Sequence, residues 1–129
     1  MDRSNVAKMF PYLTAIEELA SGSYKTVYRA AHDDHGDVVL KIIKPSKDKP
    51  ESIERIKREI RSSEIIKSDH IPRIFASDVS GEDIWIIEEY INGETLRNVI
   101  NAKKKFSLVE IYGFLETMLL IIIQAEQKR

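Results

Sequence analysis

The sequence predicts an α+β fold with elements in the order β-β-β-α-β-β-α-α, and three observations support this prediction. Short stretches rich in β-branched residues alternate with turns that contain glycine or aspartate, which is typical of strands. Residues 50–67 begin with a proline and carry an apolar stripe at helical spacing. Farther along, Ser107 and Glu110 have the spacing of a capping box, which indicates the start of a long helix.

The first part of the chain is predicted to form three strands with a glycine-bearing turn between the first two. The expected strands are residues 13–19, 26–30 and 38–43. The third strand is nearly continuous in apolar residues, with Lys41 as its one interruption. A lysine there is costly unless its ammonium group meets a carboxylate or a phosphate, although an edge strand would let the side chain reach solvent.

The rest of the chain is predicted to alternate between helices and one further pair of strands. Asp48 is the expected N-cap of the first helix. Pro72 breaks any helix that would continue through the loop after this first helix. The expected elements are a helix at residues 50–67, strands at 73–79 and 83–90, a short helix at 94–102 and a long helix from 108 nearly to the end.

Size and composition point to one domain with no bulk electrostatic character. The chain has 129 residues, a formal net charge of −1 and no cysteine. These values exclude thiol chemistry and disulfides, and they give no whole-chain reason to bind nucleic acid or an anionic membrane. The N-terminus lacks a signal-peptide pattern, and the apolar run 118–123 is too short to span a bilayer. We therefore expect a cytoplasmic protein that is soluble or held by a partner.

Four segments carry a resemblance to a known family. They are Leu19-Ala20-Ser21-Gly22-Ser23-Tyr24-Lys25-Thr26-Val27, Val38-Val39-Leu40-Lys41, Arg58-Glu59-Ile60 and Glu89-Tyr90-Ile91-Asn92-Gly93-Glu94. In this order and spacing they resemble the Gly-rich loop, the V-A-I-K strand, the helix glutamate and the hinge of a protein kinase of the Ser/Thr type or a kinase-like protein.

The resemblance implies a specific architecture. Residues 1–91 would form the nucleotide-binding N-lobe, a five-stranded antiparallel sheet plus one helix. Residues 92–129 would form the exit of the hinge and the first two helices of an incomplete C-lobe.

The resemblance also implies an ATP site. Lys41 and Glu59 would be the catalytic ion pair, with Lys41 reaching the phosphates. The implied nucleotide-binding residues are Leu19, Ala20, Ser21, Gly22, Ser23, Tyr24, Lys25, Val27, Val39, Lys41, Glu89 and Ile91. Leu19, Val27 and Val39 would sandwich the adenine, and the Glu89 carbonyl and Ile91 amide would bond to its edge.

Three positions depart from the family pattern. Ala20 and Lys25 replace the first and third glycines of the loop, and Lys25 either approaches phosphate or, as we expect, points into solvent. Glu88 occupies the position before the hinge where the family normally has an apolar residue or threonine. We consider two alternatives for it: Glu88 competes with Glu59 for Lys41, or a shift of one residue in register turns it outward.

Phosphoryl transfer in this family needs residues that the sequence does not contain. Neither His-Arg-Asp nor Asp-Phe-Gly occurs, so no Mg²⁺ ligands are assigned and the chain alone is expected to be inactive. Two functions remain open: the ATP-binding part of a protein kinase acting on protein hydroxyls, or a non-catalytic, pseudokinase-like module that docks a partner.

The last predicted helix bears on this choice, because residues 118–123 are apolar on every side. Such a helix is expected to be buried. We expect the gene product to continue past Arg129; the alternatives are a partner chain that covers residues 108–127, or self-association through them.

Overall fold

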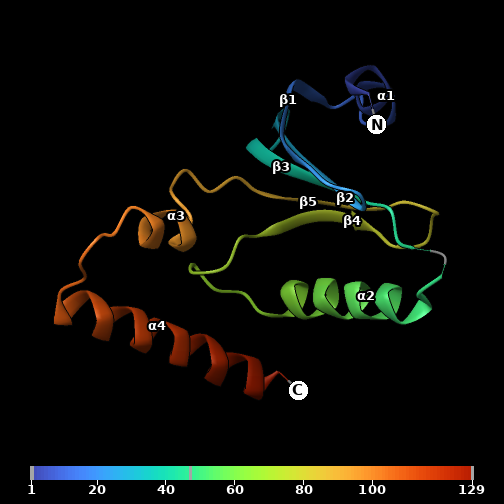
Figure 1. Ribbon diagram of the computed structural model, residues 1–129. Helices are drawn as coiled ribbons and strands as arrows, with labels where there is room; N and C mark the ends of the chain where they lie inside the picture. The colour runs from blue at the N-terminus through green and yellow to red at the C-terminus, as the bar shows by residue number, and fades with distance from the viewer. Residues whose placement is uncertain (1, 47, 129) are drawn as a thin grey trace.

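The computed structural model describes residues 2–46 and 48–128 and contains four helices and five strands within them. Their bounds are α1 Arg3–Met9, β1 Leu13–Ser21, β2 Lys25–His32, β3 Gly36–Ile43, α2 Pro50–Ile65, β4 Ile74–Asp78, β5 Ile84–Glu89, α3 Leu96–Asn101 and α4 Leu108–Gln127. Figure 1 shows α2 below the sheet, α1 beyond its opposite side, and α3 and α4 beside one end.

The sheet has the order β1-β2-β3-β5-β4, and every pair of neighbours is antiparallel. The predicted α+β class with a five-stranded antiparallel sheet is therefore confirmed. The two long helices are also confirmed: α2 precedes β4 in the chain, and α4 follows β5 and α3. Strand ends differ from the predicted ones by a few residues, since pairing with a neighbour extends β1 through Ser21 and starts β3 at Gly36.

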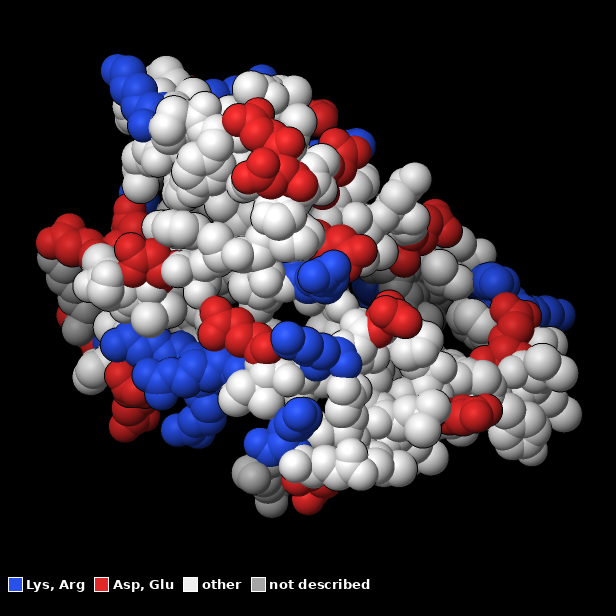
Figure 2. All heavy atoms as spheres, turned by 180° about the vertical axis from the view of Figure 1, so that it is seen from behind, with Lys and Arg blue, Asp and Glu red and all other residues white. Residues whose placement is uncertain are grey.

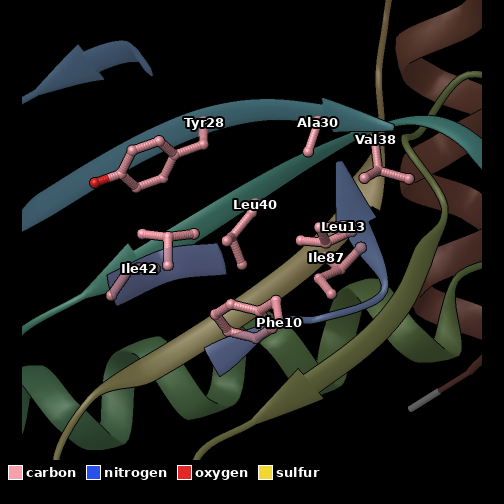
Figure 3. Packing of buried hydrophobic residues seen from close by; sticks show 9 residues of the cluster. Phe10, Leu13, Tyr28, Ala30, Val38, Leu40, Ile42 and Ile87 are labelled. Atoms are coloured by element: carbon pink, nitrogen blue, oxygen red, sulfur yellow. The ribbon is translucent and has the colours of Figure 1, made fainter. Parts of the chain in front are cut away.

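One face of the sheet is covered by the N-terminal segment, which the sequence prediction left unassigned. Val6 of α1 is fully buried, and Phe10 packs edge-on against Trp85 of β5 at 5.1 Å between ring centroids. Figure 3 shows the apolar side chains of this cluster converging from β1, β2, β3 and β5. Its buried members are Val6, Phe10, Leu13, Tyr28, Ala30, Val38, Leu40, Ile42 and Ile87. Residues 2–12 thus complete the core.

The opposite face packs against α2 through a second apolar cluster. Ile60 of α2 is buried against Ile84 and Ile86 of β5, with Ile53 and Ile56 at its margin, as the helical spacing predicts. The helix begins at Pro50 as predicted, but the predicted cap at Asp48 is wrong, because the N-cap is Lys49, whose side chain forms no cap hydrogen bond. The fixed φ of Pro50 at the first helical position supplies the start instead.

Both helices after β5 begin with a side-chain cap. Thr95 accepts a hydrogen bond from the Asn98 amide at the start of α3. The predicted capping box of α4 is confirmed: the Glu110 amide donates to the Ser107 hydroxyl, and the Ser107 amide donates to the Glu110 carboxylate, each at 3.2 Å. Local chemistry thus sets where α4 starts.

The surface of α4 is mostly apolar and exposed. Leu115, Leu119 and Ile122 are each about half exposed, and Figure 2 shows few charged side chains over this part of the molecule. Among the described residues, α4 alone has the length and composition of a membrane span, with a mean hydropathy of 1.7 over an 18-residue window. A helix buried inside a protein has the same length and composition, so these two properties do not distinguish a membrane span from a buried helix.

Substituting Lys103 by glycine should stabilise the end of α3 by about 0.5–1 kcal/mol. Lys103 has φ 58°, and its amide and that of Lys104 bond back to Ile100 and Val99 in a Schellman motif. Glycine adopts this left-handed conformation without the steric cost of a Cβ. Chemical denaturation measures the change. Lys105→Gly, at a position without positive φ, is the control and should not stabilise; equal effects of the two substitutions would contradict the prediction.

Candidate functional site

One face of the sheet brings together residues from three strands that the sequence singled out. Val27 of β2 pairs with Lys41 of β3, and Val39 of β3 pairs with Glu88 of β5. Directly opposed residues share a face, as do residues two apart on one strand. All four side chains therefore lie on one face of the sheet. The same face packs against α2 through Ile84 and Ile86 of β5.

The Lys41 ammonium group forms an ion pair with the Glu88 carboxylate on this face. Lys41 is 28% exposed and Glu88 15% exposed, which makes this the most buried of the ion pairs formed among the described residues. Glu88 therefore points inward, and the alternative in which a register shift turns it outward is wrong. The pair also explains how an apolar strand accommodates a lysine, because each charge offsets the desolvation of the other.

The ion pair between Lys41 and Glu59 that the resemblance implies is not formed, and the structure corrects that expectation. Glu59 lies on the outer side of α2, is 65% exposed, and pairs instead with Arg55 one turn earlier at 3.2 Å. Its neighbour Ile60 is the residue of this turn that faces the sheet. Because successive helical residues point about 100° apart, burying Ile60 in this way leaves Glu59 at the margin.

The glycine-bearing turn closes the β1–β2 hairpin as predicted. The Gly22 amide donates to the Lys25 carbonyl at 2.8 Å, and the Ser21 and Thr26 hydroxyls lie 3.4 Å apart. A Cβ added at Gly22 would meet the Lys25 carbonyl oxygen at 3.7 Å, an ordinary contact, so internal packing does not require glycine here. The tip of the hairpin is exposed, including Tyr24 and the side chain of Lys25.

Two other residues assigned to the loop lie in β1. Leu19 sits at an irregularity where the register shifts between Glu18 and Ala20, and it is about half exposed. A bulge of this kind bends the strand and redirects a side chain. Ala20 returns to regular pairing opposite Val27.

The end of β5 forms backbone hydrogen bonds with Arg73 on one side and with Asp37 on the other. The Glu89 amide donates to the Arg73 carbonyl at 2.8 Å, and its carboxylate accepts from the Arg73 amide at 3.2 Å. The Tyr90 amide donates to the Asp37 carbonyl at 3.4 Å. Ile91 is exposed, and none of the described residues accepts a hydrogen bond from its amide. The segment assigned to the hinge therefore keeps one donor available.

A group that the sequence reasoning missed joins β2 and β3 to this segment. The Arg29 guanidinium group bonds to the Asp37 carboxylate at 2.7 Å and lies 4.1 Å above the centre of the Tyr90 ring. The hydrogen bond that Arg29 donates to the Asp37 carboxylate raises the pKa of Arg29, so the cation persists at every physiological pH. Strand alternation places Arg29 on the face of Val27, but its contact with Tyr90 depends on the register of three strands.

The structure also contains a cavity of about 720 Å³. It lies between the end of α2, the loop at residues 66–73, and Leu120 and Gln124 of α4. The Gln124 side chain donates to the Lys67 carbonyl across it. No residue assigned to the nucleotide site lines this cavity. Across residues 2–46 and 48–128 no group of three or more acidic, histidine or cysteine side chains is placed to hold a metal ion.

An antiparallel sheet with a glycine-bearing hairpin, a half-buried lysine on β3 and the helix α2 packed on the face of that lysine define the small lobe of a kinase-like protein. The family model described as "Protein kinase domain" matches residues 13–123. The chain belongs to the protein kinase family. The match includes α3 and most of α4, so these two helices belong to the same family domain as the sheet.

The chain is also similar to a serine/threonine-protein kinase, pakG, from Dictyostelium discoideum. The two are 35% identical over 92 residues, which is 71% of this chain. The chain spans 7% of the length of that relative.

Proposed function

We propose that the chain forms the nucleotide-binding lobe of a Ser/Thr-type protein kinase that transfers phosphate from ATP to a protein hydroxyl. The observation that carries the proposal is the kinase-domain match over residues 13–123 together with Lys41 beside Val27 and Val39. The similarity to a serine/threonine-protein kinase supports the Ser/Thr type. We further propose a cytoplasmic location, as the composition suggests.

Three features of the candidate site fit an adenine nucleotide. Val27 and Val39 supply apolar contacts for a planar base, and the Ile91 amide is available as a donor to its edge. The tip at Gly22 has no side chain to hold a phosphate group away from the backbone. A fourth feature that a nucleotide site needs, a lysine free to meet phosphate, is not present, because Lys41 is paired with Glu88.

The chain by itself should not catalyse phosphoryl transfer. The reaction needs an aspartate to accept the substrate proton and further side chains to hold Mg²⁺, and the family carries them in His-Arg-Asp and Asp-Phe-Gly sequences that are absent from these 129 residues. Binding is therefore the property to test in this polypeptide.

Lys41→Met should weaken ATP binding at least about tenfold, because it leaves the Glu88 carboxylate without its counter-ion, and an unneutralised carboxylate repels the expected phosphates. Calorimetric titration and the rise in melting temperature with ATP both measure the loss. Lys44→Met is the matched control: it removes the same charge from an exposed position just beyond β3, and it should bind ATP as the wild type does. An equal affinity of Lys41→Met and wild type would contradict a nucleotide site at Lys41.

The second candidate is a non-catalytic kinase-like module that serves as a protein-binding unit. The observation that favours it is the Lys41–Glu88 pair, with Ala20 and Lys25 as supporting departures from the loop pattern. The coding sequence downstream of residue 129 separates the two. His-Arg-Asp and Asp-Phe-Gly sequences there support the kinase, and a stop codon supports the module.

A further inference from the structure

The half-buried ion pair on the candidate nucleotide face has a consequence for how phosphate would be bound. Among the described residues, Glu88 is the one ion-pair partner of Lys41. The combined exposure of the two side chains is lower than that of any other ion pair in this part of the chain. Glu88 stands opposite Val39 and next to the residues assigned to the hinge. The carboxylate therefore lies on the same face of the sheet as Val39 and is paired with the lysine.

A carboxylate in this position acts on the same ammonium group that a phosphate would use. Its negative charge neutralises the field of Lys41, and in a partly desolvated site it also repels an incoming phosphate. The purine and ribose carry no charge, so the carboxylate has little electrostatic effect on them. Glu88 should therefore lower the affinity for a nucleotide with charged phosphates and leave the affinity for the nucleoside nearly unchanged.

We propose that Glu88 is an internal counter-ion that sets the affinity of the site for nucleotide phosphates. This inference rests on the proposed function, because it assigns a determinant of specificity to the same site. With Glu88 in place, the chain gains little affinity from the triphosphate of ATP over adenosine. Displacing Glu88 from Lys41 releases the ammonium group and makes the site selective for the charged nucleotide.

The test compares ATP with adenosine, so that the ratio of their affinities isolates the contribution of the phosphates. Glu88→Gln keeps the size of the side chain and removes its charge. It should tighten ATP binding about tenfold and change adenosine binding less than about twofold. The gain should disappear in the Lys41→Met background, because the ammonium group is then absent. Glu82→Gln removes the same charge from the exposed β4–β5 turn and should leave both affinities unchanged.

The outcomes separate the two levels of the proposal. If Glu88→Gln leaves the ATP-to-adenosine ratio at the wild-type value while Lys41→Met weakens ATP binding, the role of Glu88 is overturned and the nucleotide site stands. If no variant binds either ligand, the nucleotide site itself is overturned. Glu88→Met removes the carboxylate through a different side chain, and melting curves without ligand show that each variant is folded. Should only one of the two Glu88 substitutions tighten ATP, the effect is steric and the electrostatic proposal fails.

Discussion

Replacing Phe10 by alanine will lower the free energy of unfolding by about 3–5 kcal/mol. Phe10 is 2% exposed, packs edge-on against Trp85 and Tyr12, and joins the N-terminal segment to the main core. Its truncation removes apolar contacts from both and leaves a cavity that neighbouring side chains fill only in part. Such a loss is a large fraction of the stability of a domain of this size.

Urea denaturation followed by Trp85 fluorescence measures this change, because the indole ring lies against Phe10. Met9→Ala is the matched control: Met9 is the preceding residue at the end of α1 and is about half exposed. That substitution should change stability by about 0.5 kcal/mol or less. If the two substitutions cost the same, residues 2–12 do not belong to the core.

The second large effect is expected at Ile60, where alanine should cost about 2–5 kcal/mol. Ile60 is 4% exposed and is the side chain through which α2 enters the cluster with Ile84 and Ile86. An isolated helix of 16 residues is marginally stable in water, so α2 depends on this contact. Its loss should loosen α2 more than the strands.

Hydrogen exchange resolved along the chain tests this prediction, because amides of α2 should exchange faster in Ile60→Ala than those of β3 and β5. Ile65→Ala makes the same change on the same helix at a side chain that is 50% exposed, and it should leave exchange in α2 close to wild type. Uniformly faster exchange over the whole chain would show that α2 and the sheet unfold as one unit.

The elements that the sequence predicted correctly are those whose signal lies within one short window. Alternation and turn residues place β1 to β5, and the Ser107 and Glu110 pair places the start of α4, because each pattern reflects contacts made within the element or with its neighbour. The helix α1 was missed because seven residues with Val6 as their one buried side chain carry no apolar period. The cap at Asp48 was wrong by one residue, a distance that local patterns do not resolve.

The candidate site was predictable in its residues and only partly in its contacts. The sequence predicted Lys41 in an apolar strand, and the resemblance gave two acidic residues, Glu59 and Glu88, as its possible ion-pair partners. Which one does so depends on how α2 is rotated and on the register of β3 against β5, and the resemblance pointed to Glu59. Arg29 above Tyr90 was missed for the same reason, since residues from separate strands meet there.

By itself, the sequence determined the order of the elements and the position of the glycine-bearing hairpin, because these follow from local periodicity and turn residues. Membership in the protein kinase family was also contained in the sequence, as four motifs in the family's order and as the family-model match. Only the tertiary structure decided that residues 2–12 close one face of the sheet and that Glu88 holds Lys41. Ion pairs and core contacts between distant segments depend on separations of a few ångströms and on burial. Those quantities exist only once the strands and helices are packed.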